Sequence, residues 1–169
     1  MSPILFLFLQ FCILAYALVG GVFLAFSDFL MRSLARTGGS GGIDAMQVIN
    51  REVFRWVFMA LFLGLAPVSL LIAGYGGILV DGGAGVLMTA AGLSYLVGCF
   101  GVTVAVNVPM NDALSRMDAT GPDAHEYWSG TYLPRWTLWN TVRTLACVLS
   151  AALLLSAVLR LARSGVATP

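Results

Sequence analysis

The sequence predicts an all-α membrane protein, a bundle of four transmembrane helices in up-down-up-down order. Of the 169 residues, 59% are hydrophobic and only 10% are charged, whereas a soluble domain has about 25% charged residues. The hydrophobic residues fall into four long runs that are almost free of charge. Each run is long enough for a helix that crosses the hydrocarbon core, which takes about 20 residues.

The four runs are expected to form a single integral membrane domain over residues 1–169. The first run lacks the basic start of a signal peptide, so we expect its helix to be retained. Pro67 and Pro109 predict kinks in the second and third helices, and Arg143 interrupts the fourth run. The expected spans cover about residues 3–27, 56–80, 84–107 and 136–160.

The three connections differ in length and pattern. A short glycine-rich turn joins the second and third runs, which suits an antiparallel pair of helices. Glycines at 38–42 interrupt the first connection, and their flanks have helical spacing. We therefore expect helices 1 and 2 to extend beyond the membrane and to turn at these glycines. In the third connection, Gly121-Pro122-Asp123 is typical of a helix start, which predicts a short interfacial helix over about 123–132.

The charges exclude one class of partner and suggest an orientation. A net charge of +1 without a basic cluster argues against nucleic acid. Seven of the nine arginines lie near the first and third connections. The positive-inside rule then predicts a multi-pass protein of the cell membrane with both termini on the non-cytoplasmic side. Three scattered cysteines and one histidine, His125, match no metal-binding pattern, so we expect no metal.

Polar residues recur at helical spacing at the end of the bundle that carries the first and third connections. Residues three or four apart share a helix face, and polar groups in a membrane usually face the bundle interior or water. The spacing therefore predicts a polar pocket at that end, although amides also simply hold membrane helices together. The pairs are Gln47 with Asn50, Asn107 with Asn111, and Asn140 with Arg143, and Asp112 follows Asn111.

Arg143 needs an anionic partner if it lies inside the bundle. The sequence leaves two alternatives open: a carboxylate, from Asp28 or Asp112, or the oxyanion of a ligand such as a phenolate, which a guanidinium suits. The aromatic residues Trp128, Tyr132 and Trp136 also have two interpretations. They fit an interfacial aromatic belt or the wall of a pocket for a flat aromatic ligand, closed by Trp128 or Trp136.

The motifs resemble those of the DUF1772 or anthrone-oxygenase-like membrane proteins. Four segments carry the resemblance, together with Trp128 and Tyr132: residues 26–31, 42–50, 107–114 and 136–144. The resemblance implies a four-helix integral membrane protein. Fungal members oxidise an anthrone to an anthraquinone with molecular oxygen and no dedicated metal or flavin, while many bacterial members have no assigned function. In the family a histidine commonly follows the asparagine of the helix 4 motif, and this chain has Thr141 there.

An oxygenase acting on an anthrone- or phenol-like substrate is the function that the resemblance implies, with oxygen as co-substrate and no cofactor. Developing negative charge needs hydrogen-bond donors, and the chemistry needs a base, for which Asp112 and His125 are the candidates. The predicted catalytic residues are Asn107, Asn111, Asp112, Asn140 and Arg143, and the predicted substrate-binding residues are Gln47, Asn50, Trp128, Tyr132 and Trp136.

Two other classes of function compete with the enzyme, and the sequence does not decide whether the protein is an enzyme. The main alternative is a non-catalytic membrane protein that binds a lipid, a quinone or a partner helix in the same pocket. A small transporter is disfavoured because the sequence has neither charges in mid-membrane nor inverted repeats. The expected partners are membrane lipid and a hydrophobic small molecule, and the sequence is compatible with a homo-oligomer.

Overall fold

The computed structural model describes residues 2–55 and 57–166, and within these ranges every regular element is helical. Four helices are long and apolar enough to cross a membrane, as predicted. They cover Pro3–Leu34, Val57–Leu79, Gly82–Ser115 and Pro122–Arg163. The predicted all-α class and the four spans are therefore confirmed.

The first long helix consists of α1 (Pro3–Ala25), a π-helical segment η1 (Phe26–Leu30) and α2 (Met31–Leu34). Its start is set by Ser2, whose hydroxyl oxygen accepts a hydrogen bond from the backbone N–H of Leu5 at 3.2 Å. This is an N-cap, and the proline that follows has the backbone angle of a first helical residue.

Helix 2 does not extend beyond the membrane as one helix, in contrast to the expectation. The chain forms α3 (Gly41–Glu52), and a separate α4 (Val57–Leu79) carries the second span. The residues 53–55 between them are in a turn. Arg55 pairs with Glu52 at 3.1 Å, while Val53 and Phe54 line a cavity described below. Irregular backbone at the edge of a membrane is tolerated where it lines a cavity.

The third long helix follows a tight reversal. Gly82 has φ +72°, a left-handed conformation that glycine adopts at little cost, and α5 (Gly82–Leu93) starts there. The helix continues through two π-helical segments, η2 (Ser94–Gly101) and η3 (Thr103–Asn107), into α6 (Val108–Ser115). Pro109 thus falls in the first turn of α6, directly after the π-helical part, where its missing N–H is accommodated.

The predicted short interfacial helix is present but does not end. It begins as α7 (Pro122–Tyr127), passes through the π-helical segment η4 (Trp128–Trp136) and joins α8 (Thr137–Val166). Pro134 lies within η4, and the π-helical geometry lets the helix pass this proline without a break. The aromatic residues of η4 therefore lie on the same continuous helix as Arg143.

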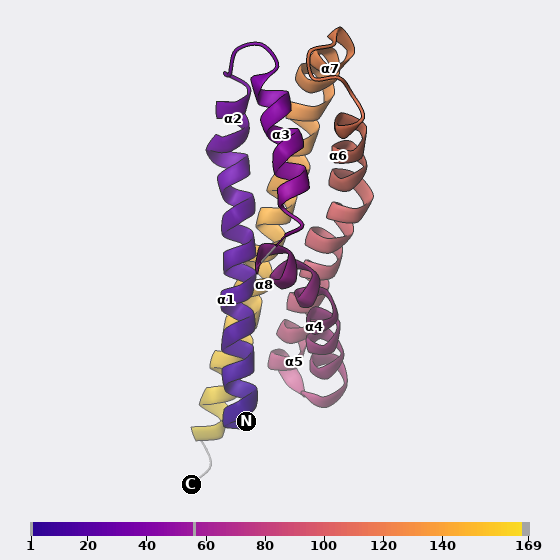
Figure 1. The fold of residues 1–169 in the computed structure, drawn as a ribbon. Helices are drawn as coiled ribbons and strands as arrows, with labels where there is room; N and C mark the ends of the chain where they lie inside the picture. Colours follow the sequence, from indigo (N-terminus) through magenta and orange to yellow (C-terminus); the bar gives the residue numbers. More distant parts are fainter. Residues whose placement is uncertain (1, 56, 167–169) are drawn as a thin grey trace.

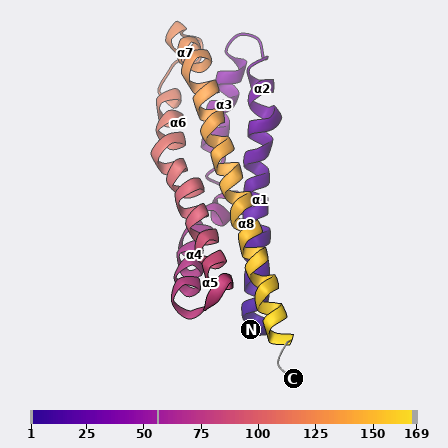
Figure 2. The same ribbon diagram turned by 180° about the vertical axis from the view of Figure 1, so that it is seen from behind.

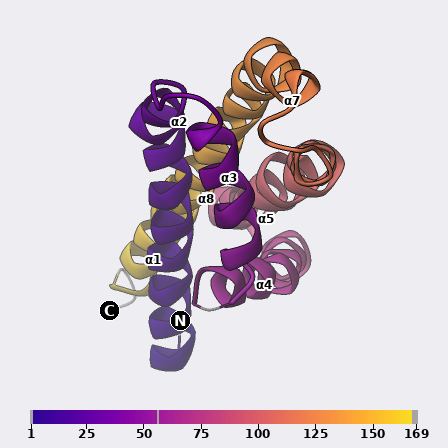
Figure 3. The same ribbon diagram turned by 45° about the horizontal axis from the view of Figure 1, so that its top comes forward.

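The helices define two ends of an elongated bundle. The start of α1, the end of α8 and the α4–α5 turn lie at one end, which we call the turn end. The connections at residues 35–40 and 116–121 lie at the other, the connection end (Figures 1 and 2). The helices α1 and α8 lie side by side, and α4 and α5 form a hairpin beside them. In Figure 3, α3 lies between α1–α2 and α6, over the connection end.

Two hydrophobic cores fill the bundle. The turn-end core is built from α1, α4, α5, η2 and α8, and includes Tyr16, Phe62 and Tyr95. The connection-end core includes Met46, Tyr132 and Trp136 and is built from α2, α3, α6, α7 and η4. The site lies where these two cores meet.

Candidate functional site

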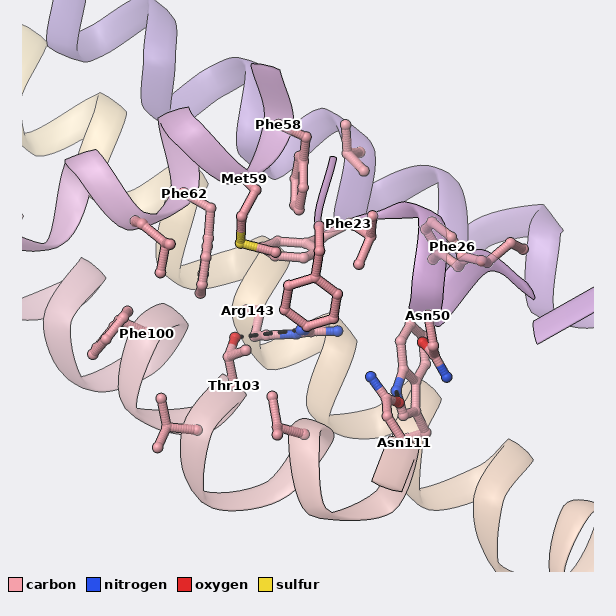
Figure 4. A pocket seen from close by; sticks show the side chains of 18 of the residues that line it. Phe23, Phe26, Asn50, Phe58, Met59, Phe62, Phe100, Thr103, Asn111 and Arg143 are labelled. Carbon is pink, nitrogen blue, oxygen red and sulfur yellow. Dashed lines mark hydrogen bonds between the residues drawn. The ribbon is translucent and has the colours of Figure 1, made fainter. Parts of the chain in front are cut away.

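A cavity of about 250 Å³ lies at the border between the two cores, beside the turn that separates α3 from α4 (Figure 4). Its wall is mostly apolar, and four polar side chains interrupt it: Asn50, Thr103, Asn111 and Arg143. Since a cavity of about 150 Å³ accepts benzene, this one has room for a ligand larger than a single ring. The apolar wall is formed mainly by Phe23, Phe26, Phe58, Met59, Phe62, Phe100 and Trp136.

Arg143 on α8 is the charged group of the cavity wall, and its residue surface is only 5% exposed. Its Nη2 donates to Oδ1 of Asn140 at 2.7 Å, and its Nη1 donates to Oγ1 of Thr103 at 3.3 Å. The guanidinium carbon lies 4.2 Å from the ring centre of Phe23 and 5.1 Å from that of Trp136. The guanidinium is therefore held between two aromatic rings, at distances typical of cation–π contacts.

Neither of the two carboxylates expected as alternatives is the partner of Arg143. Asp28 has 67% of its side chain exposed and pairs with Arg32 on the same helix at 3.4 Å. Asp112 is exposed and does not line the cavity. Among the described residues the ion pairs are Arg32–Asp28 and Arg55–Glu52, and the Nε of Arg143 has no hydrogen-bond partner. A buried cation without a counter-ion is costly, which makes this cavity suited to an anionic group.

Asn140 orients Arg143 and is itself fixed by helix 1. Its Nδ2 donates to the backbone carbonyl of Phe23 and to the hydroxyl of Ser27, each at 2.6 Å. The side chain thus crosses from α8 to the start of η1. Phe23 lies in the last turn of α1 and Ser27 in η1, so Asn140 fixes Arg143 relative to the junction of these two segments.

Thr141, at the position where related proteins commonly carry histidine, points away from the cavity. Its hydroxyl donates to the carbonyl of Thr137 at 2.9 Å and lies 3.0 Å from the Ser27 hydroxyl. It lines a separate surface groove with Met31 and Leu133. A base at this position would therefore not touch a ligand beside Arg143 in this arrangement.

Asn111 organises the aromatic wall. Its Oδ1 accepts two hydrogen bonds, from the Tyr132 hydroxyl at 2.7 Å and from Nε1 of Trp136 at 2.8 Å. Nδ2 of Asn50 donates to the Tyr132 hydroxyl at 3.4 Å. One amide therefore fixes a phenol and an indole, and the network joins α3, α6 and η4.

The aromatic residues of η4 form a stack that reaches the cavity at one end. The rings of Trp128 and Tyr132 lie 5.3 Å apart, and those of Tyr132 and Trp136 lie 6.0 Å apart, both pairs nearly parallel. Trp136 lines the cavity, whereas Trp128 and Tyr132 lie behind it in the connection-end core. Of the two tryptophans expected to close the pocket, Trp136 is the one in place.

Asn107 and Gln47 lie outside the cavity. Asn107 is fully buried and donates to the carbonyl of Trp136 at 3.3 Å, while its Oδ1 has no hydrogen-bond partner. Gln47 donates to the carbonyls of Leu114 and Met117 at 2.9 and 3.0 Å. Leu114 lies in the last turn of α6, where helical donors run out, and Met117 lies just beyond it, so Gln47 on α3 caps the end of α6.

A polar groove adjoins the cavity between α3 and α6. It has a volume of about 360 Å³ and contains the exposed side chains of Arg51 and Asp112. The cavity and the groove lie next to each other and share four lining residues: Asn50, Phe54, Val108 and Asn111. Asp112 is thus near the cavity without facing it.

The candidate bases and metal ligands are sparse. His125 lies half-buried on α7 and lines neither the cavity nor the groove. Among the described residues no group of three His, Cys, Asp or Glu side chains is placed to hold a metal ion. The polar chemistry available inside the cavity is therefore that of one guanidinium, two amides and one hydroxyl.

Sequence reasoning missed several residues of the cavity. Thr103 lines the cavity and its hydroxyl donates to the carbonyl of Cys99 at 2.8 Å, and it stands alone in an apolar run. Phe58 and Phe62 are four residues apart and stack at 6.2 Å, a spacing that the sequence shows. Nothing in the sequence separates them from other lipid-facing phenylalanines.

The fold and the cavity define a class: a protein with four helices that are able to span a membrane and an apolar cavity lined by one buried arginine. A comparison with protein families matches residues 51–153 to the anthrone oxygenase family, which is more than half of the 169 residues. The chain belongs to this family. The same comparisons found no match among curated proteins or solved structures.

Proposed function

We propose that this protein is an oxygenase that acts on a flat aromatic substrate, such as an anthrone or a phenol, whose oxygen substituent bears negative charge once a proton is lost. The observation that carries the proposal is Arg143, a buried guanidinium that lines an apolar cavity and has no carboxylate partner among the described residues. An anionic oxygen in the cavity would offset the cost of that buried charge. Membership of the anthrone oxygenase family supports the same chemistry.

The apolar wall suits the body of such a substrate. Phe23, Phe58 and Phe62 pack against each other with ring centres between 5.6 and 6.3 Å apart, and Phe100 extends this set at 5.8 Å from Phe62. Aromatic pairs favour such offset and edge-to-face arrangements. Fused rings bound among them would place an oxygen substituent of the rings beside Arg143.

The reaction balances with oxygen as the oxidant. Loss of a proton from the activated ring carbon gives an anion whose charge is shared with the carbonyl oxygen attached to the ring system. That carbon then bonds to molecular oxygen, which accepts the electron pair, and protonation gives a hydroperoxide. Loss of water from the hydroperoxide leaves a carbonyl, so an anthrone becomes an anthraquinone. Arg143, oriented by Asn140 and Thr103, would stabilise the anion formed in the first step.

The proton acceptor is assigned to Asp112, through water in the polar groove. Asp112 does not line the cavity, but it lies in the groove that shares Asn50 and Asn111 with it. A base acting through one water is compatible with general base catalysis. His125 has no such connection, because it lines neither space.

The experiment uses the full chain in lipid vesicles with anthrone as the substrate, and measures oxygen uptake and anthraquinone absorbance. Vesicles without protein give the background oxidation. Replacing Arg143→Leu should lower kcat/KM by about 100-fold or more, the cost of losing an oxyanion donor. The matched control is Arg55→Leu, which removes an exposed arginine and should leave the rate unchanged. An Arg143→Leu variant with the wild-type rate would refute the proposal.

A second candidate function is a non-catalytic binding protein for a quinone or a lipid. The observation in its favour is that neither a carboxylate nor an imidazole lines the cavity, and that Thr141 points elsewhere. The two candidates differ in one measurement. A binding protein would hold a hydroxyanthraquinone in an Arg143-dependent way and would show no anthrone oxidation above the vesicle background.

The location is proposed together with the function. We propose the cell membrane, with membrane lipid and a hydrophobic small molecule as partners and both termini on the non-cytoplasmic side. The support is the arginine distribution, seven near the connection end against two near the turn end, under the positive-inside rule. A reporter fused after Pro169 should be active only on the non-cytoplasmic side, and a cytoplasmic signal would contradict this orientation.

A further inference from the structure

The apolar helix α4 and the charged end of α3 indicate that the cavity lies at the boundary between the hydrocarbon layer and the membrane interface. Charged side chains are costly within hydrocarbon, and Arg51, Glu52 and Arg55 are exposed at the end of α3. They mark the level at which the membrane interface begins. The part of the cavity lined by α4 therefore lies in the hydrocarbon layer, and the part lined by α3 lies in the interface.

On the hydrocarbon side, the outward-facing wall of the cavity is entirely apolar. Three cavity-lining residues from α1, α4 and η3 are exposed there on the surface of the chain, and we call them the lipid-facing rim: Val22, Leu63 and Val104. The polar lining residues are all less exposed than these, and Arg143 is buried. Lipid chains would therefore contact the apolar rim and not the guanidinium.

On the interface side, the cavity adjoins the polar groove between α3 and α6. There the shared residues Asn50 and Asn111 are followed by the exposed charges of Arg51 and Asp112. A fused-ring ligand passing through this groove would have to displace water from both charges, and stripping water from a charge without pairing it is costly. Water and protons meet no such barrier.

We propose that the aromatic ligand enters the cavity sideways from the hydrocarbon layer, across the lipid-facing rim, while the polar groove carries only water and protons. This inference rests on the proposed function for the kind of ligand. It adds two roles that the chemistry alone does not assign. Leu63 and Val104 control ligand entry, and Arg51 with Asp112 keeps the ligand out of the groove.

The test measures association, not turnover. The full chain is placed in vesicles, and 1,8-dihydroxyanthraquinone, already dissolved in the same bilayer, is used as the probe in stopped-flow absorbance. Leu63→Trp and Val104→Trp, which narrow the rim, should slow association by about tenfold, a change within the range that access constraints produce. The opposite changes, Leu63→Ala and Val104→Ala, should speed it, so that poor folding of a bulky variant cannot imitate the result.

The controls place the same bulk elsewhere. Leu70→Trp on α4 and Val97→Trp on η2 change exposed residues that do not line the cavity, and both should associate at the wild-type rate. Ser115→Trp fills the polar groove and should also leave association unchanged. Slowing by Ser115→Trp, with wild-type rates in the two rim variants, would overturn the proposal and indicate entry through the groove.

The outcomes for entry and for chemistry are separable. Wild-type protein that binds the probe across the rim but never oxidises anthrone would contradict the oxygenase function and support the entry route. Protein that oxidises anthrone at the same kcat/KM in the rim variants, with unchanged probe association, would support the oxygenase and overturn the entry route.

Discussion

The two ends of the bundle differ in how closely their helix backbones approach, although tyrosine hydroxyls form hydrogen bonds between helices at both ends. At the turn end the helix backbones nearly touch: a Cβ added at Gly76 would lie 2.5 Å from the Cβ of Met88, and one at Gly92 would collide with the carbonyl oxygen of Ser69. At the connection end, amides and aromatic hydroxyls cross between helices, as Asn111 does with Tyr132. In lipid, small residues and polar bonds both hold helices together, since burial of apolar groups is no longer a driving force.

The difference explains where the cavity lies. Small residues let α4 and α5 pack closely at the turn end, while large rings and amide bridges space the helices at the connection end. The cavity occurs where one mode of packing gives way to the other, between Phe62 of the turn-end core and Trp136 of the connection-end core. A polar network can keep an apolar space open because its hydrogen bonds fix the helices at a distance.

The largest effect on stability is expected at the turn end. Gly92→Ala places a methyl group against the Ser69 carbonyl and the Ala73 side chain, and overpacking of this kind costs about 1–3 kcal/mol. Thermal unfolding in detergent should show a clear drop in Tm. The matched control is Gly74→Ala on α4, which has no atom within 4 Å of the new methyl and should unfold like the wild type. Equal Tm values for both variants would disprove close backbone packing.

The next effect has the opposite sign and lies at the cavity. Arg143→Leu removes a buried charge that has no counter-ion, and replacing buried charges with apolar residues is often stabilising, here by about 1–2 kcal/mol. Tm in the absence of ligand should therefore rise while probe binding is lost. A fall in Tm would show that the bonds to Asn140 and Thr103 outweigh the cost of burying the charge.

A smaller loss is expected in the amide network. Tyr132→Phe deletes the hydroxyl that donates to Asn111 and accepts from Asn50, and a buried hydrogen bond contributes about 1 kcal/mol. Tm should fall modestly. Tyr75→Phe on α4, which removes a partly exposed hydroxyl, is the control and should not change Tm. A Tyr132→Phe variant as stable as this control would show that the hydrogen-bond network does not stabilise the connection end.

The smallest effect is expected for a polar bond of the turn end. The Ser156 hydroxyl donates to the carbonyl of Ala152 within the same helix at 2.8 Å and is exposed. Bonds of this kind link no helices, so Ser156→Ala should change the unfolding free energy by less than about 0.5 kcal/mol. A change as large as that of Tyr132→Phe would mean that the two ends do not differ in the way proposed.

The sequence was sufficient for the spans because charge is largely excluded from lipid, and the four runs almost free of charge correspond to the four long helices. The helix-face argument for Asn140 and Arg143 also holds, since the two side chains are directly bonded. The same argument could not place Asn107 or Gln47, which point to helix backbones instead. Spacing within one helix fixes a face, but not which neighbour that face meets.

Other features depend on contacts between distant segments. The turn between α3 and α4 and the continuous helix through Pro134 were both missed, because rules for helix ends treat each segment alone. In the structure, π-helical geometry absorbs Pro134, and the cavity accepts the irregular backbone at 53–55. The phenylalanines of the cavity were missed for a different reason. In an apolar run, the residue type does not distinguish a side chain that lines a cavity from one that faces lipid.

The absence of a counter-ion for Arg143 has a consequence for pH. A phenol that is ionised beside the guanidinium must leave its proton behind when it binds. By linkage, its apparent affinity should then rise about tenfold for each pH unit until the pH passes the pKa of the free phenol, and stay constant above it. The cavity wall holds neither an acid nor a histidine, so this dependence would belong to the ligand. Occupancy of the site would therefore report the acidity of its surroundings.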